Sequence, residues 1–198
     1  MAGNTRFCWA VTWTVFAGAS LCGCSRPPQT ARGTDQIKPS YNAQTGRLEK
    51  ITYDRNHDGK VDAWMSMDGT RVVRAELDEN YDGAVDRWEY YDPPAGASGA
   101  SSGTQDAGTL SQVEISTRHD GKASRVEFFE RGQRVRVEED TDGDGKVDKW
   151  ETWANGAQSR IVFDTDGDGR PDRRLTYHQD GSDPLFEKAD ADGRFPTP

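Results

Sequence analysis

The residues best suited to chemistry form one short acidic run, from Asp140 to Glu151. Across these twelve residues, carboxylates occupy positions 1, 3, 5, 9 and 12, and glycine occupies position 6. With this spacing, alternate side chains converge on one cation, Gly145 permits a sharp turn, and the carbonyl of Lys146 supplies a further oxygen. A set of ligands that are all oxygen favours calcium over zinc or copper. We therefore expect Ca²⁺ as the cofactor of this loop.

Three further runs share the pattern and begin at Asp54, Asp78 and Asp164. The predicted metal ligands of the four loops, counting the backbone carbonyl of position 7, are Asp54, Asn56, Asp58, Lys60 and Asp62; Asp78, Asn80, Asp82, Ala84, Asp86 and Glu89; Asp140, Asp142, Asp144, Lys146, Asp148 and Glu151; and Asp164, Asp166, Asp168, Arg170 and Asp172. Position 12 is Met65 in the first loop and Leu175 in the fourth, so a bidentate carboxylate is missing there.

A metal-free turn is the alternative for each loop, because Asp and Asn side chains bond the neighbouring backbone and so favour turns. A single acidic turn would support nothing more. Four copies, each crowding several carboxylates or amides into one turn, are harder to explain without a cation, since the carboxylates repel one another. The repeated pattern therefore favours metal binding.

The acidic loops recur at a fixed spacing of 24 residues, from Asp54 to Asp78 and again from Asp140 to Asp164. Between these pairs lies a degenerate copy that begins at Ser116 and keeps only the position 5 aspartate and the position 6 glycine. A fixed period of this length predicts stacked copies of one supersecondary unit.

The segments before the loops predict β-strands. They alternate apolar and polar residues, as in 51–53 and 135–137, and a period of two is typical of a strand with one buried face. Hairpin-turn signals, among them Asp68-Gly69 and Asn155-Gly156, stand between the loops. The segments after the loops carry bulky residues three apart, which could open a helix, but their short length favours a strand with an irregularity.

The predicted fold class is all-β, an array of antiparallel β-hairpin repeats of period 24 joined by acidic calcium-type loops. A flat sheet, a solenoid and a closed ring are all compatible with this pattern. The loops resemble those of EF-hand proteins, dockerins and thrombospondin type 3 repeats. That resemblance covers only the loops, because an EF-hand needs a helix on both sides and the incoming segments here predict strands.

The N-terminus predicts an export signal. Arg6 precedes an apolar stretch, 7–19, that is too short to span a bilayer. The run 21–24, Leu-Cys-Gly-Cys, then resembles the bacterial lipobox. The resemblance implies cleavage after residue 23, lipid on Cys24 and, with Ser25 next, the outer membrane of a bacterial cell envelope. Lipid on the earlier cysteine and an ordinary secretory signal are the alternatives.

The predicted organisation has three parts: a lipoprotein signal peptide at 1–23, a flexible tether at 24–40 and the β-hairpin repeat domain at 41–198. Within the repeat domain, a low-complexity stretch at about 92–109 is predicted to be a surface insertion.

Composition limits what the chain can be. Hydrophobic residues make up 33% of the chain, so we expect a small core that repetition or metal helps to stabilise. A formal net charge of −9 makes nucleic acid an unsuitable partner. The sequence has no nucleophile motif, phosphate-binding loop or zinc-ligand spacing, so we expect no enzymatic activity.

These features predict a lipid-anchored envelope protein whose calcium-stabilised repeats act as a structural or binding module. Its partners would be the membrane, through the lipid on Cys24, and an unidentified protein or glycan. Trp64, Trp88 and Trp150 share one register and could form packed core or an exposed platform. A calcium-dependent adhesin or glycan-binding protein with exposed aromatics is one alternative function. An accessory part of a surface enzyme complex, as dockerin-like loops would imply, is another.

Overall fold

The computed structural model describes residues 36–93 and 108–196. The chain divides into two units, Met1–Arg32 and Gly33–Pro198, and all described residues belong to the second. That unit contains twelve strands: β1 (Ile37–Tyr41), β2 (Leu48–Tyr53), β3 (Ala63–Asp68), β4 (Arg71–Leu77), β5 (Arg87–Asp92), β6 (Thr109–Ile115), β7 (Arg125–Glu130), β8 (Gln133–Glu139), β9 (Lys149–Ala154), β10 (Ala157–Phe163), β11 (Arg173–Thr176) and β12 (Leu185–Lys188).

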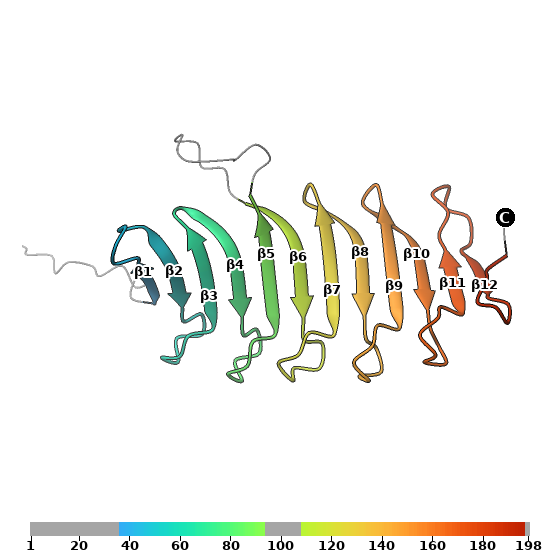
Figure 1. The fold of residues 1–198 in the computed structure, drawn as a ribbon, viewed down its shortest axis with the longest axis horizontal. Helices are drawn as coiled ribbons and strands as arrows, with labels where there is room; N and C mark the ends of the chain where they lie inside the picture. The colour runs from blue at the N-terminus through green and yellow to red at the C-terminus, as the bar shows by residue number, and fades with distance from the viewer. Residues whose placement is uncertain (1–35, 94–107, 197–198) are drawn as a thin grey trace, which may run out of the picture. The chain divides into compact units, whose positions relative to one another are not determined.

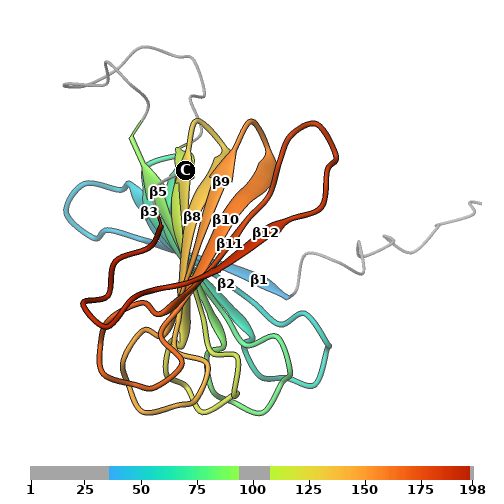
Figure 2. The same ribbon diagram turned by 90° about the vertical axis from the view of Figure 1, so that its right-hand side faces the viewer.

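The strands form one antiparallel sheet in which each strand pairs with the next one in sequence, from β1 to β12 (Figure 1). The predicted all-β array of antiparallel hairpins is confirmed, and the arrangement is an open sheet rather than a solenoid or a ring. The sheet twists along its length, as a view along the row of strands makes clear (Figure 2).

The segments after the acidic loops are strands, so the helical alternative is wrong within the described residues. The irregularity expected in these strands lies instead on their partners, as a register shift that recurs near the hairpin turns, for example opposite Ser66 and Met67 and opposite Phe128 and Phe129. Such a β-bulge increases the local twist while the strand continues. The extra residue is Val73 on β4 or Val135 on β8, so it does not account for the bulky residues three apart on the strands after the loops.

The hairpin turns lie where the glycine signals predicted them. In the turn between β9 and β10, Asn155 and Gly156 both have positive φ, 52° and 77°, which matches the twist of the flanking strands. Between β3 and β4 the turn residues are Gly69 and Thr70, one position later than predicted, because Asp68 still pairs with Arg71. These two turns are thus two residues long, whereas β11 and β12 are joined by the longer segment 177–184.

The structure bears on two predicted boundaries, the end of the tether and the limits of the insertion. Residues 37–40, predicted as the end of the tether, belong to β1 and pair with β2. The predicted insertion begins at the end of β5 and ends at the start of β6, but its residues 94–107 lie outside the described residues. The predicted signal peptide and the predicted lipidation site, Cys24, also lie outside them.

The sheet buries few apolar side chains. Among the described residues the buried hydrophobic ones are Ala63, Ala75, Val113 and Val137. A row of direct cross-strand partners on one face reads Ala75, Glu89, Val113, Glu127, Val137 and Glu151. Valine and glutamate alternate in this row, and the stems of long charged side chains cover the valines.

The glutamates of this row are tied to basic side chains. Arg125 lies 2.9 Å from Glu127 and 2.8 Å from Glu139, and Lys149 lies 2.9 Å from Glu151. The charged network therefore covers much of the sheet face where a larger protein would have a second layer, and this is how a chain with so small an apolar fraction maintains the sheet.

Candidate metal centre

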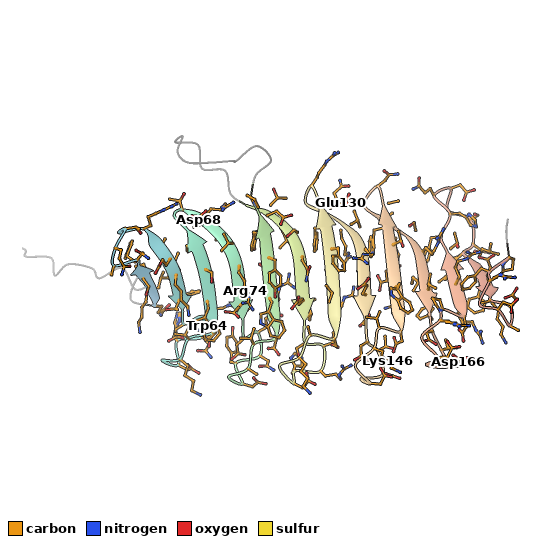
Figure 3. The ribbon with its side chains drawn as sticks, in the orientation of Figure 1. Trp64, Asp68, Arg74, Glu130, Lys146 and Asp166 are labelled. Carbon is orange, nitrogen blue, oxygen red and sulfur yellow. The ribbon has the colours of Figure 1, made fainter. Side chains whose placement is uncertain are left out.

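The four acidic loops and the degenerate loop lie along one edge of the sheet, which we call the loop edge. They connect β2 to β3, β4 to β5, β6 to β7, β8 to β9 and β10 to β11 (Figure 1). Lys146 and Asp166 lie at this edge, whereas Asp68 and Glu130 lie at the opposite edge, near the hairpin turns (Figure 3). The period of 24 residues in the sequence therefore becomes a row of adjacent loops.

Backbone hydrogen bonds link each loop to the next. The N–H of Asp78 donates to the carbonyl of Asp62 at 2.8 Å, and the N–H of Asp164 donates to the carbonyl of Asp148 at 2.8 Å. In each case position 1 of one loop binds position 9 of the loop before it. Adjacent loops are thus joined through the backbone at these two positions.

Position 1 organises the interior of each loop. The carboxylate of Asp140 accepts the N–H of Gly143 at 2.6 Å and the N–H of Gly145 at 3.0 Å. Asp54, Asp78 and Asp164 accept the equivalent pair of donors in their own loops. The role predicted for position 6 is confirmed, because Gly145 has a φ of 89°.

Position 4 also has positive φ, which the sequence analysis missed. It is Gly143 or Gly167 in the last two loops, but His57 (φ 68°) or Tyr81 (φ 65°) in the first two. The glycines at this position were the available signal, since a residue with a Cβ is strained there.

Positions 5, 7 and 9 complete the loop. The carboxylate of Asp148, at position 9, accepts the N–H groups of Thr141 and Asp142 and so joins the two ends of the loop. The N–H of Lys146 donates to Asp144 at 2.8 Å, and the other position 7 residues donate in the same way to position 5, namely Lys60, Ala84 and Arg170. The predicted ligands therefore lie around one turn held by backbone donors.

Two clusters of carboxylates could hold a metal ion. Oxygens of Asp140, Asp142 and Asp148 lie within 4.8 Å of one another, as do oxygens of Asp164, Asp166 and Asp168. These oxygens come from positions that the sequence predicted as ligands, and they suit a hard cation.

The first two loops differ because position 3 is asparagine. The side-chain amide of Asn56 donates to Asp58 at 3.2 Å, and that of Asn80 donates to Asp82 at 3.0 Å. In these two loops, an amide proton thus bridges positions 3 and 5, where the last two loops have two carboxylates.

The structure does not bring the position 12 glutamates into the loops. Glu151 is 5% exposed and accepts hydrogen bonds from Lys149 and Gln158 on the sheet face. Glu89 is paired with Arg87 and accepts the Tyr91 hydroxyl at 2.5 Å. Burial, with the hydrogen bond to Glu89, raises the pKa of Tyr91 to about 12.

The position 12 glutamates stay out of the loops because each loop leads into a strand. Position 12 then falls in the cross-strand row of valines and glutamates, where side chains stand perpendicular to the sheet. In an EF-hand, a helix would instead direct this residue back to the ion. Glu127, at position 12 of the degenerate loop, lies in the same row.

The position 1 carboxylates of the last two loops favour the charged form. Burial works to raise the pKa of Asp140, but the N–H donors of Gly143 and Gly145 and the guanidinium of Arg118 outweigh it and lower that pKa. Burial also opposes ionisation of Asp164, yet the N–H groups of its loop glycines lower its pKa below the usual value. Both loops therefore carry concentrated negative charge at neutral pH.

The degenerate loop keeps its shape with other residues. The hydroxyl of Ser116 accepts the N–H of Asp120 at 3.1 Å, and the hydroxyl of Ser124 accepts the N–H of Thr117 at 3.0 Å. Serine thus replaces aspartate at positions 1 and 9 while similar backbone bonds remain. Two basic side chains of this loop reach its neighbours, and sequence reasoning missed both.

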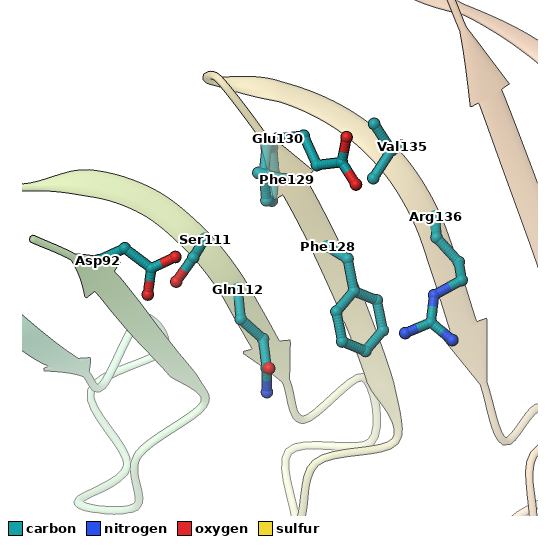
Figure 4. Close-up of a pocket in the computed structure, with 8 residues that line it drawn as sticks. All are labelled: Asp92, Ser111, Gln112, Phe128, Phe129, Glu130, Val135 and Arg136. Carbon is teal, nitrogen blue, oxygen red and sulfur yellow. The ribbon is translucent and has the colours of Figure 1, made fainter. Parts of the chain in front are cut away.

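A shallow hollow of about 410 Å³ lies on β5 to β8, toward the hairpin-turn edge (Figure 4). Phe128 and Arg136 line it, and the guanidinium of Arg136 lies 3.9 Å from the centre of the Phe128 ring. The cation thus lies against the Phe128 ring, and Phe129 lines the hollow beside it.

Comparisons with known proteins add little. No family model matches the chain, and neither does any curated protein. Among solved structures, it is similar to one titled "Crystal structure of accessory secretory protein 1,2 and 3 in Streptococcus pneumoniae", with 18% identity and a TM-score of 0.31. The match covers 66% of this chain and only 19% of that one, and so weak a likeness carries no argument about function. Within the described residues, no helix is long and apolar enough to cross a membrane.

Proposed function

We propose that this protein is a lipid-anchored component of a bacterial envelope whose hairpin sheet is stabilised by calcium and acts as a structural or binding module. The observation that carries the proposal is the cluster of Asp164, Asp166 and Asp168, whose oxygens lie within 4.8 Å of one another. No ion pair among the described residues involves any of these three side chains. Like charges held this close favour a bound cation.

Calcium suits these residues better than other metals. The cluster offers carboxylate oxygens on a flexible loop, and Arg170 adds a backbone carbonyl at position 7. Because position 12 lies on the sheet face, the loops lack a bidentate glutamate, so an affinity of about 10⁻⁴ to 10⁻³ M is expected, as in extracellular modules. Bound calcium would neutralise the loop and hold its ligands together.

The effect would extend beyond one loop. Position 9 of one loop binds position 1 of the next through the backbone, as Asp148 binds Asp164. Calcium in one loop would therefore order the neighbouring connection and stabilise the pairing of adjacent hairpins. This suits a protein whose sheet has few buried apolar side chains.

The half-buried Trp64, Trp88 and Trp150 support a packing role rather than an open platform for sugars. The strands on both sides of each acidic loop give no support to a dockerin-like pair of helices. We therefore prefer the structural or binding module to the adhesin and to the accessory part of an enzyme complex, and we propose no catalytic activity.

Thermal melting of the mature chain in detergent, with CaCl₂ or with chelator, tests the calcium proposal. At about 100 times the Kd, calcium would add roughly 3 kcal/mol, or about 5–10 °C for a domain of this size. Replacing Asp164, Asp166 and Asp168 together by Asn should remove much of this shift. A matched control replaces Glu130 by Gln and Asp183 by Asn, both exposed and outside the loops. Identical melting with calcium and with chelator would refute the proposal.

The anchor is tested separately. Labelled fatty acid should mark the wild-type protein in a bacterial host and should not mark the Cys24→Ala variant. Equal labelling of both proteins, or no labelling of either, would remove the lipid anchor while leaving the calcium proposal intact.

A further inference from the structure

The degenerate loop, residues 116–124, lies between two acidic loops and carries basic side chains where they carry acids. Its position 3 is Arg118 and its position 4 is His119. The imidazole Nδ1 of His119 lies 2.9 Å from Oδ1 of Asp86, in the preceding acidic loop. Arg118 reaches the following acidic loop. The degenerate loop thus bonds to the acidic loops on both sides of it.

The contact of Arg118 is made with the residue that organises the Asp140 loop. One guanidinium nitrogen donates to Oδ2 of Asp140 at 3.1 Å, and the other donates to the backbone carbonyl of Asp140 at 3.0 Å. The Asp140 side chain is only 11% exposed. A Cβ added at Gly143 would lie 3.4–3.5 Å from the Arg118 guanidinium, so this cation packs directly against the loop backbone.

Within the part of the chain that the structure describes, no basic side chain pairs with Asp164 as Arg118 does with Asp140. By the 24-residue period, the residue that corresponds to Arg118 one repeat later is Asp142, which is a carboxylate. A Cβ added at Gly167, the counterpart of Gly143, would meet no atom of the described residues within 4 Å. The two clusters of carboxylates therefore share a pattern of residues but differ in the charge beside them.

We infer that Arg118 acts as an internal cation for the Asp140 loop, so that the Asp164 loop, and not the Asp140 loop, is the tighter and more responsive calcium site. This inference rests on the proposed calcium binding and reverses the ranking that the sequence alone favours. Calcium at Asp140 must displace a guanidinium that already neutralises Oδ2. Among the described residues, no ion pair involves Asp164, Asp166 or Asp168, and the pair of Arg173 with Asp172 lies at position 9 of that loop, 3.5 Å apart. Arg118 is a positioning residue that tunes the site without binding the metal.

Site-resolved titration distinguishes the two loops. The N–H of Gly145 donates to Asp140 and the N–H of Gly169 donates to Asp164, so each amide resonance reports on its own loop. In the wild-type mature chain titrated with CaCl₂, the Gly169 resonance should reach its midpoint at a lower calcium concentration than the Gly145 resonance. In Arg118→Gln, the Gly145 midpoint should fall by about three- to tenfold, while the Gly169 midpoint stays unchanged.

Two control variants make this result specific. Arg118→Lys keeps the positive charge and should leave the Gly145 midpoint close to that of the wild type. Arg136→Gln removes an exposed guanidinium from the sheet face and should change neither midpoint. Equal midpoints for the two glycines in the wild type, or an unchanged Gly145 midpoint in Arg118→Gln, would overturn the inference alone. Absence of any calcium-dependent shift in either glycine would instead overturn the proposed calcium binding, and the inference with it.

Melting supplies a second readout that a merely structural role would not produce. In chelator, Arg118→Gln should melt below the wild type, because Asp140 loses its cation. Saturating calcium should then close most of that gap, since the metal replaces the guanidinium. A deficit of the same size with and without calcium would contradict the role of Arg118 as an internal cation.

Discussion

The two N-terminal acidic loops, 54–62 and 78–86, and the two C-terminal ones, 140–148 and 164–172, share a backbone design but balance their charge differently. In the N-terminal pair, position 3 is asparagine and its amide donates to the carboxylate at position 5. In the C-terminal pair, position 3 is aspartate, which has no proton to donate at neutral pH. The same turn is therefore bridged by an amide proton in the N-terminal pair and lacks that proton in the C-terminal pair.

The exposure of the position 9 carboxylate also differs between the N-terminal and C-terminal loops. Asp62 and Asp86, at position 9 of the N-terminal loops, are 2% and 1% exposed. Their counterparts Asp148 and Asp172 are only partly buried. The N-terminal loops therefore bury the position 9 carboxylate, whereas the C-terminal loops leave it partly exposed and bury the position 1 carboxylates, Asp140 and Asp164.

The largest effect should come from removing a buried position 9 carboxylate. Asp86→Ala removes the acceptor of two backbone N–H groups and of His119, so we expect a loss of about 2–3 kcal/mol, with or without calcium. Asp148→Ala should cost about 1 kcal/mol, because water can reach the donors it leaves. Chemical denaturation in chelator measures both values. Equal costs would break the distinction between the two pairs of loops.

Exchanging the residue at position 3 should convert one type of loop into the other. Asn80→Asp removes the amide donor to Asp82 and adds a charge, so in chelator we expect a loss of about 1 kcal/mol and in calcium a partial recovery.

The reverse exchange, Asp166→Asn, should stabilise the fold in chelator by about 1 kcal/mol, which raises the melting temperature slightly. It should also weaken the response of the melting temperature to calcium. Differential scanning calorimetry of both variants with and without calcium tests the pair. If both variants changed the calcium response in the same direction, position 3 would not be the determinant of loop type.

The smallest effect concerns pH. The folded-state pKa values of Asp140 and Asp164 are lowered from 3.8, so their ionised forms stabilise the fold. This contribution is present above the unfolded pKa, near pH 4, and is lost as the pH falls through the lowered folded values. Carboxyl ¹³C titration should show both shifts, and Arg118→Gln should raise the pKa of Asp140 while leaving that of Asp164 unchanged. A raised Asp164 pKa in that variant would show that the two loops are not electrostatically independent.

Much of the fold could be predicted because its signals are local. The alternation before each loop, the glycine turns and the 24-residue period each depend on residues close in sequence, and the structure confirms the strands and hairpins that they indicated. The position 12 glutamates could not be placed in the same way. Whether Glu151 faces an ion or the sheet depends on the element that follows the loop, and a strand sends it to the face of the sheet.

The sequence by itself determined the loop chemistry: acids at fixed positions, glycine at position 6 and the strand on the entering side. Only the tertiary structure decided that the hairpins form one open sheet, since closure depends on twist and register accumulated over all twelve strands. The tertiary structure also decided which of the two carboxylate clusters, at Asp140 or at Asp164, pairs with a basic side chain. Arg118 and Asp140 are 22 residues apart in sequence, and only the pairing of β7 with β8 brings them within 3.1 Å. A slip in that register would move one loop along the other and separate Arg118 from Asp140.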